Sequence, residues 1–285
     1  MVGENMLRQY IDEKLGLLKG HTGVYYKNLI TGETLLTKGE DQFLAASVIK
    51  IWVMAEAFYQ IREGKIKREQ KILLCDSDKI PEGGMPDYLA QKKQGVLSDD
   101  MFPESGVLNY LHSGISFTVE DLYKLMIVIS DNTATNMLIR LLGIDKINEF
   151  IASLHMSKTR LNRLLFDTSK KKENTISLEE AGIFLEKIYR GEMISPEASR
   201  EMCAILQNQQ ANFKIPFFLP QIPIAHKTGE DNGITNDVGI VYGEVPFILC
   251  FAANDADVPS ANQACQEIAR AAYRYSLGME RLSEI

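Results

Sequence analysis

The spacing of apolar residues divides the chain into helical and strand-like stretches. Apolar side chains recur at helical spacing across residues 6–18, which predicts an amphipathic helix near the N-terminus. Two strand-like runs then flank Thr31-Gly32, a turn signal that predicts a β-hairpin. Residues 45–58 follow, apolar at most positions, and predict a buried helix that carries a lysine, Lys50, near its start.

The middle of the chain has a helical pattern with recognisable helix starts. Thr118 is expected to cap one helix, and Ser177 with Glu180 to form a capping box at the start of another. Ser195 followed by Pro196 predicts a third helix start, because proline is favoured at the first helical position. This part of the chain is therefore expected to be helical.

The pattern changes again after about residue 215. Three consecutive strand-like runs, separated by turn residues, predict a meander, and Ser260 with Gln263 are expected to cap a final helix. Residues 76–107 are rich in proline and glycine and predict a long loop of the kind that often borders a site.

Strands at both ends of the chain and helices between them predict the fold class. We expect an α/β (α+β) fold, in which an antiparallel sheet is built from both chain ends, flanked by helices, with an all-α lobe inserted. The α/β lobe is expected to comprise residues 1–60 and 212–285, and the all-α lobe residues 61–211, within one domain overall.

Composition narrows the classes of function. A formal net charge of -7, with no basic stripe, argues against nucleic acid as a partner. The four cysteines lack C-x-x-C spacing and the four histidines are not paired at i,i+4, so neither a disulfide framework nor a zinc site is expected, and no cofactor site is recognised. We expect a monomer.

The sequence also bears on localisation. No apolar run reaches the roughly 18 to 20 residues that a membrane span needs. The first residues lack the basic and apolar regions of a secretory leader. We therefore expect a cytoplasmic protein as the sequence stands, or a secreted one if a leader has been removed.

Lys50 is the first candidate for chemistry. Lysine is almost never fully buried unless it is paired or neutral. On a helix, Ser47 and Lys50 are three residues apart and share a face, so a desolvated lysine with a lowered pKa could take the serine proton. The Ser-x-x-Lys pattern also arises by chance, and a second copy, from Ser169 to Lys172, lies in a polar segment.

Two further motifs stand at informative places. The sequence SDN at residues 130–132 directly follows a predicted helix, and alone it fits a turn at a helix C-terminus. The sequence HKTGE at residues 226–230 ends a strand-like run, and alone it fits a strand that stops at a glycine turn. Each motif is ambiguous when it is taken by itself.

In this order and context, the three motifs resemble the signature of the class A β-lactamase and penicillin-binding protein superfamily. The resemblance extends over nearly the whole chain and includes the segment around the SDN motif and the strand after the Lys-Thr-Gly motif. It implies a sheet with helices on its faces beside an all-α lobe, and a serine hydrolase that acts on a β-lactam or a related amide or ester.

The resemblance implies roles in bond making and breaking for four matched residues. Ser47 would be the acylated nucleophile, and Lys50 would accept its proton, directly or through water. Ser130 would relay a proton to the leaving nitrogen. The backbone N–H groups of Ser47 and Glu230 would form the oxyanion hole, a type of site that contributes several kcal/mol to the transition state.

The resemblance also implies roles in binding. Asn132 would bind the amide of the substrate. Lys227 and Thr228 would meet its carboxylate, and Lys227 would also tune Ser130. Gly229 would allow the substrate to approach the strand closely.

The sequence departs from the family at the loop that supplies the deacylating base. Active class A enzymes carry Glu-x-x-Leu-Asn there, and its glutamate positions the hydrolytic water. Here Leu161-Asn162 is preceded by Lys158, and no glutamate lies between residues 149 and 173. Asp167 is the nearest carboxylate, and we expect it to pair with a neighbouring arginine rather than to do chemistry.

A second departure concerns the substrate carboxylate. The family often has an arginine beyond the Lys-Thr-Gly strand, where this chain has Asn236-Asp237, which weakens the case for anionic β-lactams. We expect His226 to be structural, as a lone strand histidine usually is.

Three functions remain open. The first is a hydrolase that both acylates and deacylates. The second is a penicillin-binding protein or sensor that acylates and then stalls, which the absent glutamate favours. The third is a cytosolic esterase or peptidase on the same scaffold. We rank the first highest because all three motifs are intact.

Overall fold

The structure is a computed structural model that describes residues 2–80, 105–167, 169, 171–279 and 282, so residues 81–104 of the predicted 76–107 loop lie outside the described part. The chain divides into two compact units. Unit 1 comprises Met1–Ile49, Leu154–Arg160 and Glu173–Ile285. Unit 2 comprises Lys50–Ser153 and Leu161–Lys172.

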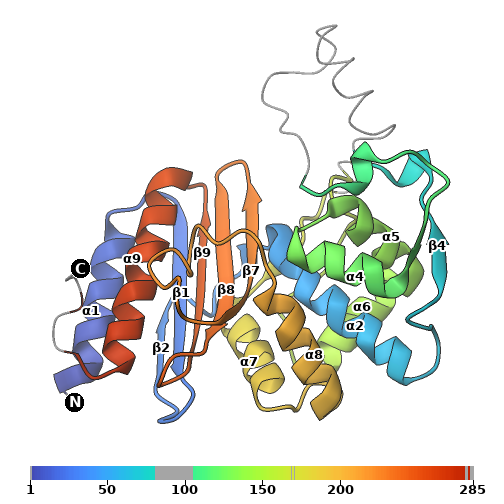
Figure 1. The fold of residues 1–285 in the computed structure, drawn as a ribbon. Helices are drawn as coiled ribbons and strands as arrows, with labels where there is room; N and C mark the ends of the chain where they lie inside the picture. Colours follow the sequence, from blue (N-terminus) through green and yellow to red (C-terminus); the bar gives the residue numbers. More distant parts are fainter. Residues whose placement is uncertain (1, 81–104, 168, 170, 280–281, 283–285) are drawn as a thin grey trace, which may run out of the picture. The chain divides into compact units, whose positions relative to one another are not determined.

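Unit 1 is built on a five-stranded antiparallel sheet with the strand order β2-β1-β9-β8-β7 (Figure 1). The strands are β1 (His21–Asn28), β2 (Thr34–Thr37), β7 (Ile224–Asp231), β8 (Ile234–Val241) and β9 (Phe247–Asn254). The helices of this unit are α1 (Val2–Gly16), α7 (Leu178–Tyr189), α8 (Pro196–Gln207) and α9 (Val258–Ser276). A short pair, β3 (Phe43–Leu44) with β6 (Thr175–Ile176), precedes the 3₁₀ turn η1 (Ala46–Ile49).

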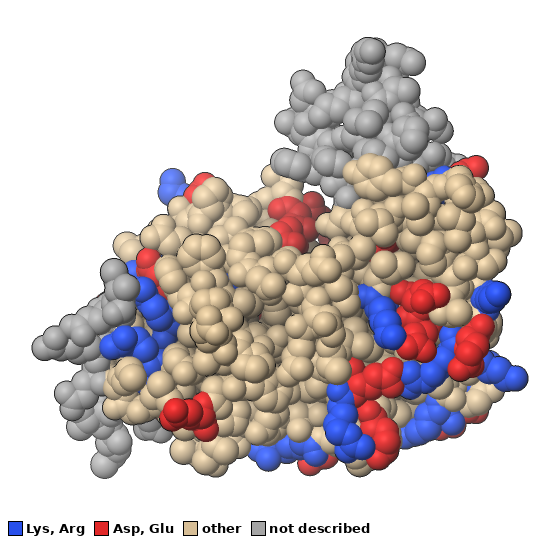
Figure 2. Space-filling view, in the orientation of Figure 1, with Lys and Arg blue, Asp and Glu red and all other residues tan. Residues whose placement is uncertain are grey.

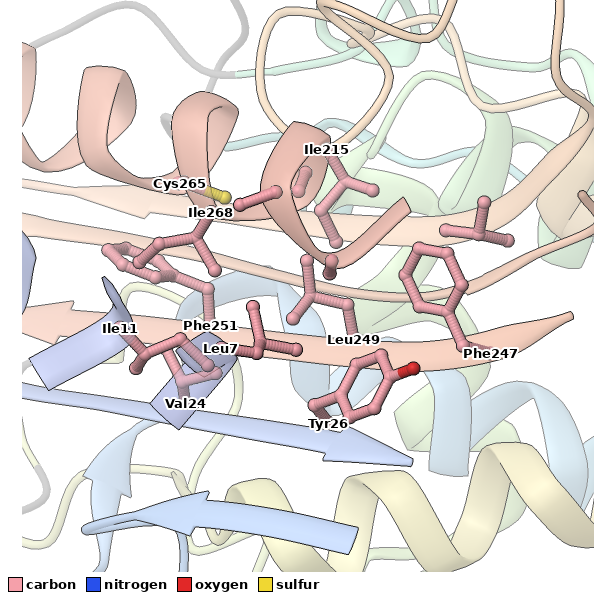
Figure 3. Packing of buried hydrophobic residues seen from close by; sticks show 14 of the residues in the cluster. Leu7, Ile11, Val24, Tyr26, Ile215, Phe247, Leu249, Phe251, Cys265 and Ile268 are labelled. Atoms are coloured by element: carbon pink, nitrogen blue, oxygen red, sulfur yellow. The ribbon is translucent and has the colours of Figure 1, made fainter. Parts of the chain in front are cut away.

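Helices cover both faces of this sheet. On one face α1 and α9 bury an apolar cluster, in which Leu7 and Ile11 of α1 lie near Val24 of β1 (Figure 3). Adjacent strand residues point to opposite faces, and Tyr25 accordingly points to the face that α7 covers. A Cβ at Gly182 of α7 would lie only 2.2 Å from the ring of Tyr25, so the glycine allows this close packing.

The predicted N-terminal helix, the hairpin around Thr31-Gly32 and the three-strand meander are confirmed. The predicted cap of the last helix is wrong, because Asp257 caps α9 and accepts a hydrogen bond from the backbone N–H of Ser260 at 3.1 Å. Helix α9 therefore begins at Val258, ahead of both residues that were expected to cap it.

The predicted capping box at the start of α7 forms only in one direction. The Ser177 hydroxyl accepts from the N–H of Glu180 at 3.4 Å. The Glu180 carboxylate instead accepts from the backbone N–H groups of Ser157, Lys158 and Thr159, at 2.7, 2.9 and 2.7 Å. A buried carboxylate thus holds a loop of the same unit, which local sequence spacing does not reveal.

Unit 2 is mainly helical. Its helices are α2 (Lys50–Arg62), α4 (Val119–Val128), α5 (Asn132–Leu142) and α6 (Ile144–Ser153), with two 3₁₀ turns, η2 (Asp76–Asp78) and η3 (Leu108–Tyr110), and the strand pair β4 (Lys71–Leu73) and β5 (Ser116–Thr118). Helix α2 packs against α4, α5 and α6, and residues 50–58 are all buried. A helix that is buried over most of its length is expected to lie in the core of its unit, and α2 does so within unit 2.

The predicted fold class is confirmed, and the compact units differ from the predicted lobes. The all-α lobe was expected to span 61–211, which would include α7 and α8. In the structure α7 packs on β1, β8 and β9, and α8 packs on β7, so both helices belong to the sheet. An amphipathic pattern predicts a helix but does not say which surface its apolar face covers.

Surface charge is mixed on the face drawn in Figure 2. Lys and Arg side chains lie beside Asp and Glu side chains over the helices at the right of the picture. Within the described ranges, no helix combines the length and the apolar character needed to cross a membrane.

Candidate active site

The residues singled out by the sequence fall into both units. Those in unit 1 are Ser47, Lys227, Thr228, Gly229 and Glu230. Those in unit 2 are Lys50, Ser130 and Asn132. The division falls between Ile49 and Lys50, within the predicted Ser-x-x-Lys motif.

In unit 2, Lys50 is the centre of a buried polar cluster. It is the first residue of α2 and is completely buried. Its Nζ donates to the backbone oxygen of Ser130 at 2.7 Å, to Ser130 Oγ at 3.1 Å and to Asn132 Oδ1 at 2.5 Å. The structure therefore brings together the lysine of one motif with the serine and asparagine of another.

A tight turn between α4 and α5 presents Ser130 to this lysine. Ser130 has a φ of 58°, in the left-handed region that residues other than glycine rarely adopt. Asp131 caps α5 by accepting from the N–H of Ala134 at 2.8 Å, and its second oxygen accepts from the N–H of Val107 and of Leu108, at 2.6 and 2.9 Å. Asp131, the middle residue of the SDN motif, thus anchors the turn that carries Ser130 and Asn132.

The same face of α5 also fixes a loop residue. Asn136 lies four residues after Asn132, one helical turn along the same face. Its Nδ2 donates to the backbone oxygen of Leu165 at 3.0 Å, and its Oδ1 accepts from the N–H of Leu165 at 2.9 Å. Asn136 therefore holds the backbone of Leu165, a buried loop residue, one helical turn along α5 from Asn132, which binds Lys50.

Lys158, which stands three residues before the Leu-Asn pair in the sequence, is not the loop residue that Asn136 binds. Lys158 belongs to unit 1, where its Nζ donates to the backbone oxygen of Glu40. The carboxylate of Asp167 accepts from the N–H and the hydroxyl of Ser169, at 3.1 and 2.5 Å. Leu165 was missed because a leucine in a loop carries no chemical signal.

In unit 1, Ser47 lies on η1 in a strained turn. The preceding residue, Ala46, has a φ of 43°. Strand β7 comes very close, because a Cβ at Gly229 would lie 3.1 Å from both the backbone nitrogen of Ser47 and the backbone oxygen of Ala45. Gly229 therefore allows the Lys-Thr-Gly strand to pack directly against the serine turn.

Lys227 and Thr228 are both completely buried on β7. Burial lowers the pKa of Lys227 to about 8, against the raising effect of the Glu230 and Asp237 carboxylates. The Lys227 Nζ donates to the backbone oxygen of Thr228 at 2.9 Å. The Thr228 hydroxyl has no hydrogen-bond partner among the residues that the structure describes.

A second buried lysine, which belongs to no motif, holds the end of β7. Lys214 pairs with the carboxylate of Glu230 and donates to the backbone oxygens of Asn236 and Gly229, at 2.8 and 3.4 Å. The Lys214 side chain is fully buried, whereas that of Glu230 is 39% exposed. Lys214 could not be recognised from the sequence, because it lies ten residues before the strand and belongs to no motif.

His226 lies in a buried network beneath the same strand. Its Nδ1 lies 2.9 Å from Asp237 Oδ1, and its Nε2 lies 3.0 Å from Asn212 Oδ1. Burial acts to raise the pKa of Asp237, but His226 and the positive charge of Lys214 hold that pKa below its usual value. These contacts agree with the structural role expected for His226.

Metal ligands are not assembled in the described parts of the chain. No group of three or more His, Cys, Asp or Glu side chains there could hold a metal ion. The cysteines Cys75, Cys203, Cys250 and Cys265 are all free.

The fold and sequence are similar to those of known β-lactamases. Residues 6–276 match the family described as the β-lactamase enzyme family. The chain is 24% identical to β-lactamase VEB-1 of Pseudomonas aeruginosa, over 94% of this chain and 89% of that protein. A β-lactamase from Sphaerobacter thermophilus has a TM-score of 0.82 and 30% identity, covering 97% of this chain and 98% of that one. The structure of PBP-A has a TM-score of 0.80 and 25% identity, covering 96% of each chain.

The fold is therefore that of the β-lactamase-like hydrolases. The chain belongs to the β-lactamase enzyme family.

Proposed function

We propose that this protein is an active-site serine hydrolase that forms an acyl-enzyme at Ser47 with a β-lactam or a related amide or ester. The observation that carries the proposal is the bond from the buried Nζ of Lys50 to the hydroxyl of Ser130, at 3.1 Å. Lys50 can carry a proton, follows Ser47 by three residues in the sequence and contacts Ser130 directly. Burying the charge of a lysine in a core helix costs free energy, and a role in proton transfer gives a reason for Lys50 to be there.

In the proposed acylation, Ser47 Oγ attacks the carbonyl carbon of the substrate. Its proton passes to Lys50, directly or through a water molecule, and a C–O bond forms as the carbonyl oxygen becomes an oxyanion. The N–H groups of Ser47 and Glu230 stabilise that oxyanion. The close packing of Gly229 on the serine turn supports this pairing of donors.

Collapse of the intermediate breaks the bond to the leaving nitrogen. Ser130 Oγ gives its proton to that nitrogen and regains one from Lys50, so Lys50 returns to its starting state. The hydrogen bond between Lys50 and Ser130 supports this relay. No external acid or base is required for acylation.

The remaining residues are proposed to bind the substrate. Asn132 binds its amide, and Lys227 and Thr228 bind a carboxylate. The Thr228 hydroxyl, buried and lacking a partner in the described part of the chain, has hydrogen-bonding capacity that such an oxygen would satisfy.

A second candidate function follows from Leu165. The family uses a loop glutamate to activate water for deacylation, and the loop residue held by Asn136 is a leucine. This favours a protein that acylates rapidly and releases the acyl group slowly, as a penicillin-binding sensor would. The similarity to PBP-A is in keeping with this alternative.

An intact-mass time course after mixing with excess benzylpenicillin tests both candidates. An adduct that appears and then decays supports turnover. An adduct that persists for hours supports the stalled form. No adduct and no loss of penicillin would overturn the proposed acylation by β-lactams, and hydrolysis of a reporter ester would then identify an esterase or peptidase on this scaffold.

A further inference from the structure

The side-chain amide of Asn236, on β8, holds the backbone just before Ser47. Its Nδ2 donates to the backbone oxygen of Leu44 at 2.9 Å and to that of Ala45 at 3.3 Å. Asn236 is completely buried and belongs to unit 1, as does the serine turn. No motif includes Asn236, and its contacts are with the backbone that leads into the proposed nucleophile.

The sheet register explains why this residue reaches the serine turn. Asn236 is paired with Gly229 across β7 and β8, and paired residues point to the same face of a sheet. Gly229 leaves the space in which the turn packs, and Asn236 supplies the hydrogen bonds that hold it there. The Asn236–Gly229 pair thus sets how closely the serine turn packs on β7 and also holds that turn by hydrogen bonds.

The hydrogen bonds donated by Asn236 Nδ2 explain why an amide side chain stands at this position. Asn236 Oδ1 has no hydrogen-bond partner among the described residues, although it is buried. An unsatisfied buried acceptor costs free energy, which an apolar side chain of the same size would avoid. The two bonds from Nδ2 are therefore the reason that an amide fits this place.

The turn needs such attachment because it is strained. Ala46 has a positive φ, and strain of this kind persists only where the surrounding contacts over-determine it. On its other side Leu44 donates its N–H to Asn254 Oδ1 at 2.7 Å, and Ala45 donates to the backbone oxygen of Asn174 at 2.9 Å. The segment before Ser47 is thus held from β8, from β9 and from the backbone at Asn174.

We propose that Asn236 is a positioning residue for acylation, which orients the N–H of Ser47 towards the same point as the N–H of Glu230. Glu230 directly follows Gly229, the residue paired with Asn236, so the two donors are related through this one pair. Lys214 reinforces the arrangement by holding the backbone oxygens of Asn236 and Gly229. The inference rests on the proposed acylation of Ser47.

The expected effect is on rate and not on affinity. A misplacement of about 1 Å in a reacting group can lower a rate about 100-fold. Replacing Asn236 should therefore lower the acylation rate constant roughly 10- to 100-fold, while the dissociation constant of the noncovalent complex stays within about twofold. Affinity for a boronic acid, which forms a tetrahedral anion on serine, should fall with the rate constant.

Two variants and one control test this. Asn236→Leu keeps the size and removes the donors. Asn236→Asp keeps the size and polarity but presents a carboxylate, which accepts and cannot donate, to the two backbone oxygens. Gln263→Leu, at an exposed position on α9 of the same unit, is the matched control. Rapid-mixing kinetics with a chromogenic cephalosporin give the rate and dissociation constants separately, and thermal melting confirms that each variant is folded.

The inference predicts a slowed acylation step in both Asn236 variants and none in the control. It is overturned if either folded variant acylates at the wild-type rate, if the loss appears in affinity alone, or if neither variant folds. A wild-type protein that neither forms an adduct nor consumes the cephalosporin in the same run overturns the proposed acylation by β-lactams itself, which separates the two failures.

Discussion

The side-chain amide of Asn136 binds both backbone polar groups of Leu165, donating to its oxygen at 3.0 Å and accepting from its nitrogen at 2.9 Å. One turn back on the same helix, Asn132 accepts from the buried Nζ of Lys50. The loop residue tied to this part of α5 is therefore a leucine, whose side chain has no group that can activate water. Under the proposed function, Lys50 and Ser130 would serve acylation, whereas this loop residue offers no base for deacylation.

Leu165→Glu should speed deacylation. A general base typically contributes about 100- to 10,000-fold, so the lifetime of the penicilloyl adduct should shorten by at least about 100-fold. The adduct is followed by intact mass after excess penicillin is removed. Leu165→Gln, of similar size and without a base, is the control, and equal lifetimes in the two variants would contradict the prediction.

Lys50→Ala should fold but lose acylation. Removing the amine removes the proposed proton acceptor, and a loss of about 100- to 10,000-fold in the acylation rate is expected. Melting should also show some destabilisation, because Ser130 and Asn132 lose a buried donor. Lys67→Ala, at an exposed site, is the control. Adduct formation by Lys50→Ala at the wild-type rate would rule out the role given to this lysine.

Binding of a carboxylate-bearing β-lactam should weaken as pH rises through about 8, where Lys227 loses its proton. Lys227→Arg should remove this pH dependence, because the guanidinium stays charged. The measurement is the dissociation constant of the noncovalent complex from pH 6 to 10. The same weakening near pH 8 in the arginine variant would mean that another group is responsible.

Weaker binding at high pH would not come from unfolding through Lys227. Its pKa in the folded protein, about 8, is below the unperturbed value of 10.5. Between these values the unfolded state binds more protons, so the contribution of this group to stability increases with pH. A melting temperature measured at pH 7 and pH 9 provides the check.

Gly229→Ala should impair acylation through the serine turn. The new Cβ would lie 3.1 Å from Ser47 N and Ala45 O, so the strand or the turn must shift by a few tenths of an ångström. We expect roughly a tenfold or larger fall in the acylation rate, because the oxyanion donors move apart. Gly16→Ala, where an added Cβ meets nothing within 4 Å, is the control. Equal rates in both variants would show that the close packing is not needed.

Much of the fold could be predicted because its signals are local. The capping residues Thr118 and Ser195 and the turn at Thr31-Gly32 act within a few residues, and the structure has helices and a hairpin where they stand. The attachment of α7 and α8 to the sheet could not be predicted in this way. It depends on long-range packing such as that of Gly182 on Tyr25.

The candidate site likewise combines residues that local sequence patterns reveal with residues whose roles depend on long-range contacts. Its motif residues were visible because serine, lysine and asparagine at fixed spacing imply chemistry. The roles now given to Asn236 and Lys214 were not visible, because they depend on contacts across the sheet. The two-residue turn Asn232-Gly233 could have revealed one of them, since it sets the register that pairs Asn236 with Gly229.

The central claim is that Ser47 becomes acylated, and peptide mapping of the penicillin adduct tests it most directly. Trypsin cleavage after Lys38 and Lys50 releases the peptide GEDQFLAASVIK, in which Ser47 is the only hydroxyl-bearing residue. The account predicts that the mass of penicillin is carried by this peptide, and that Ser47→Ala abolishes the adduct. An adduct on any other peptide, or one that survives in Ser47→Ala, would contradict it.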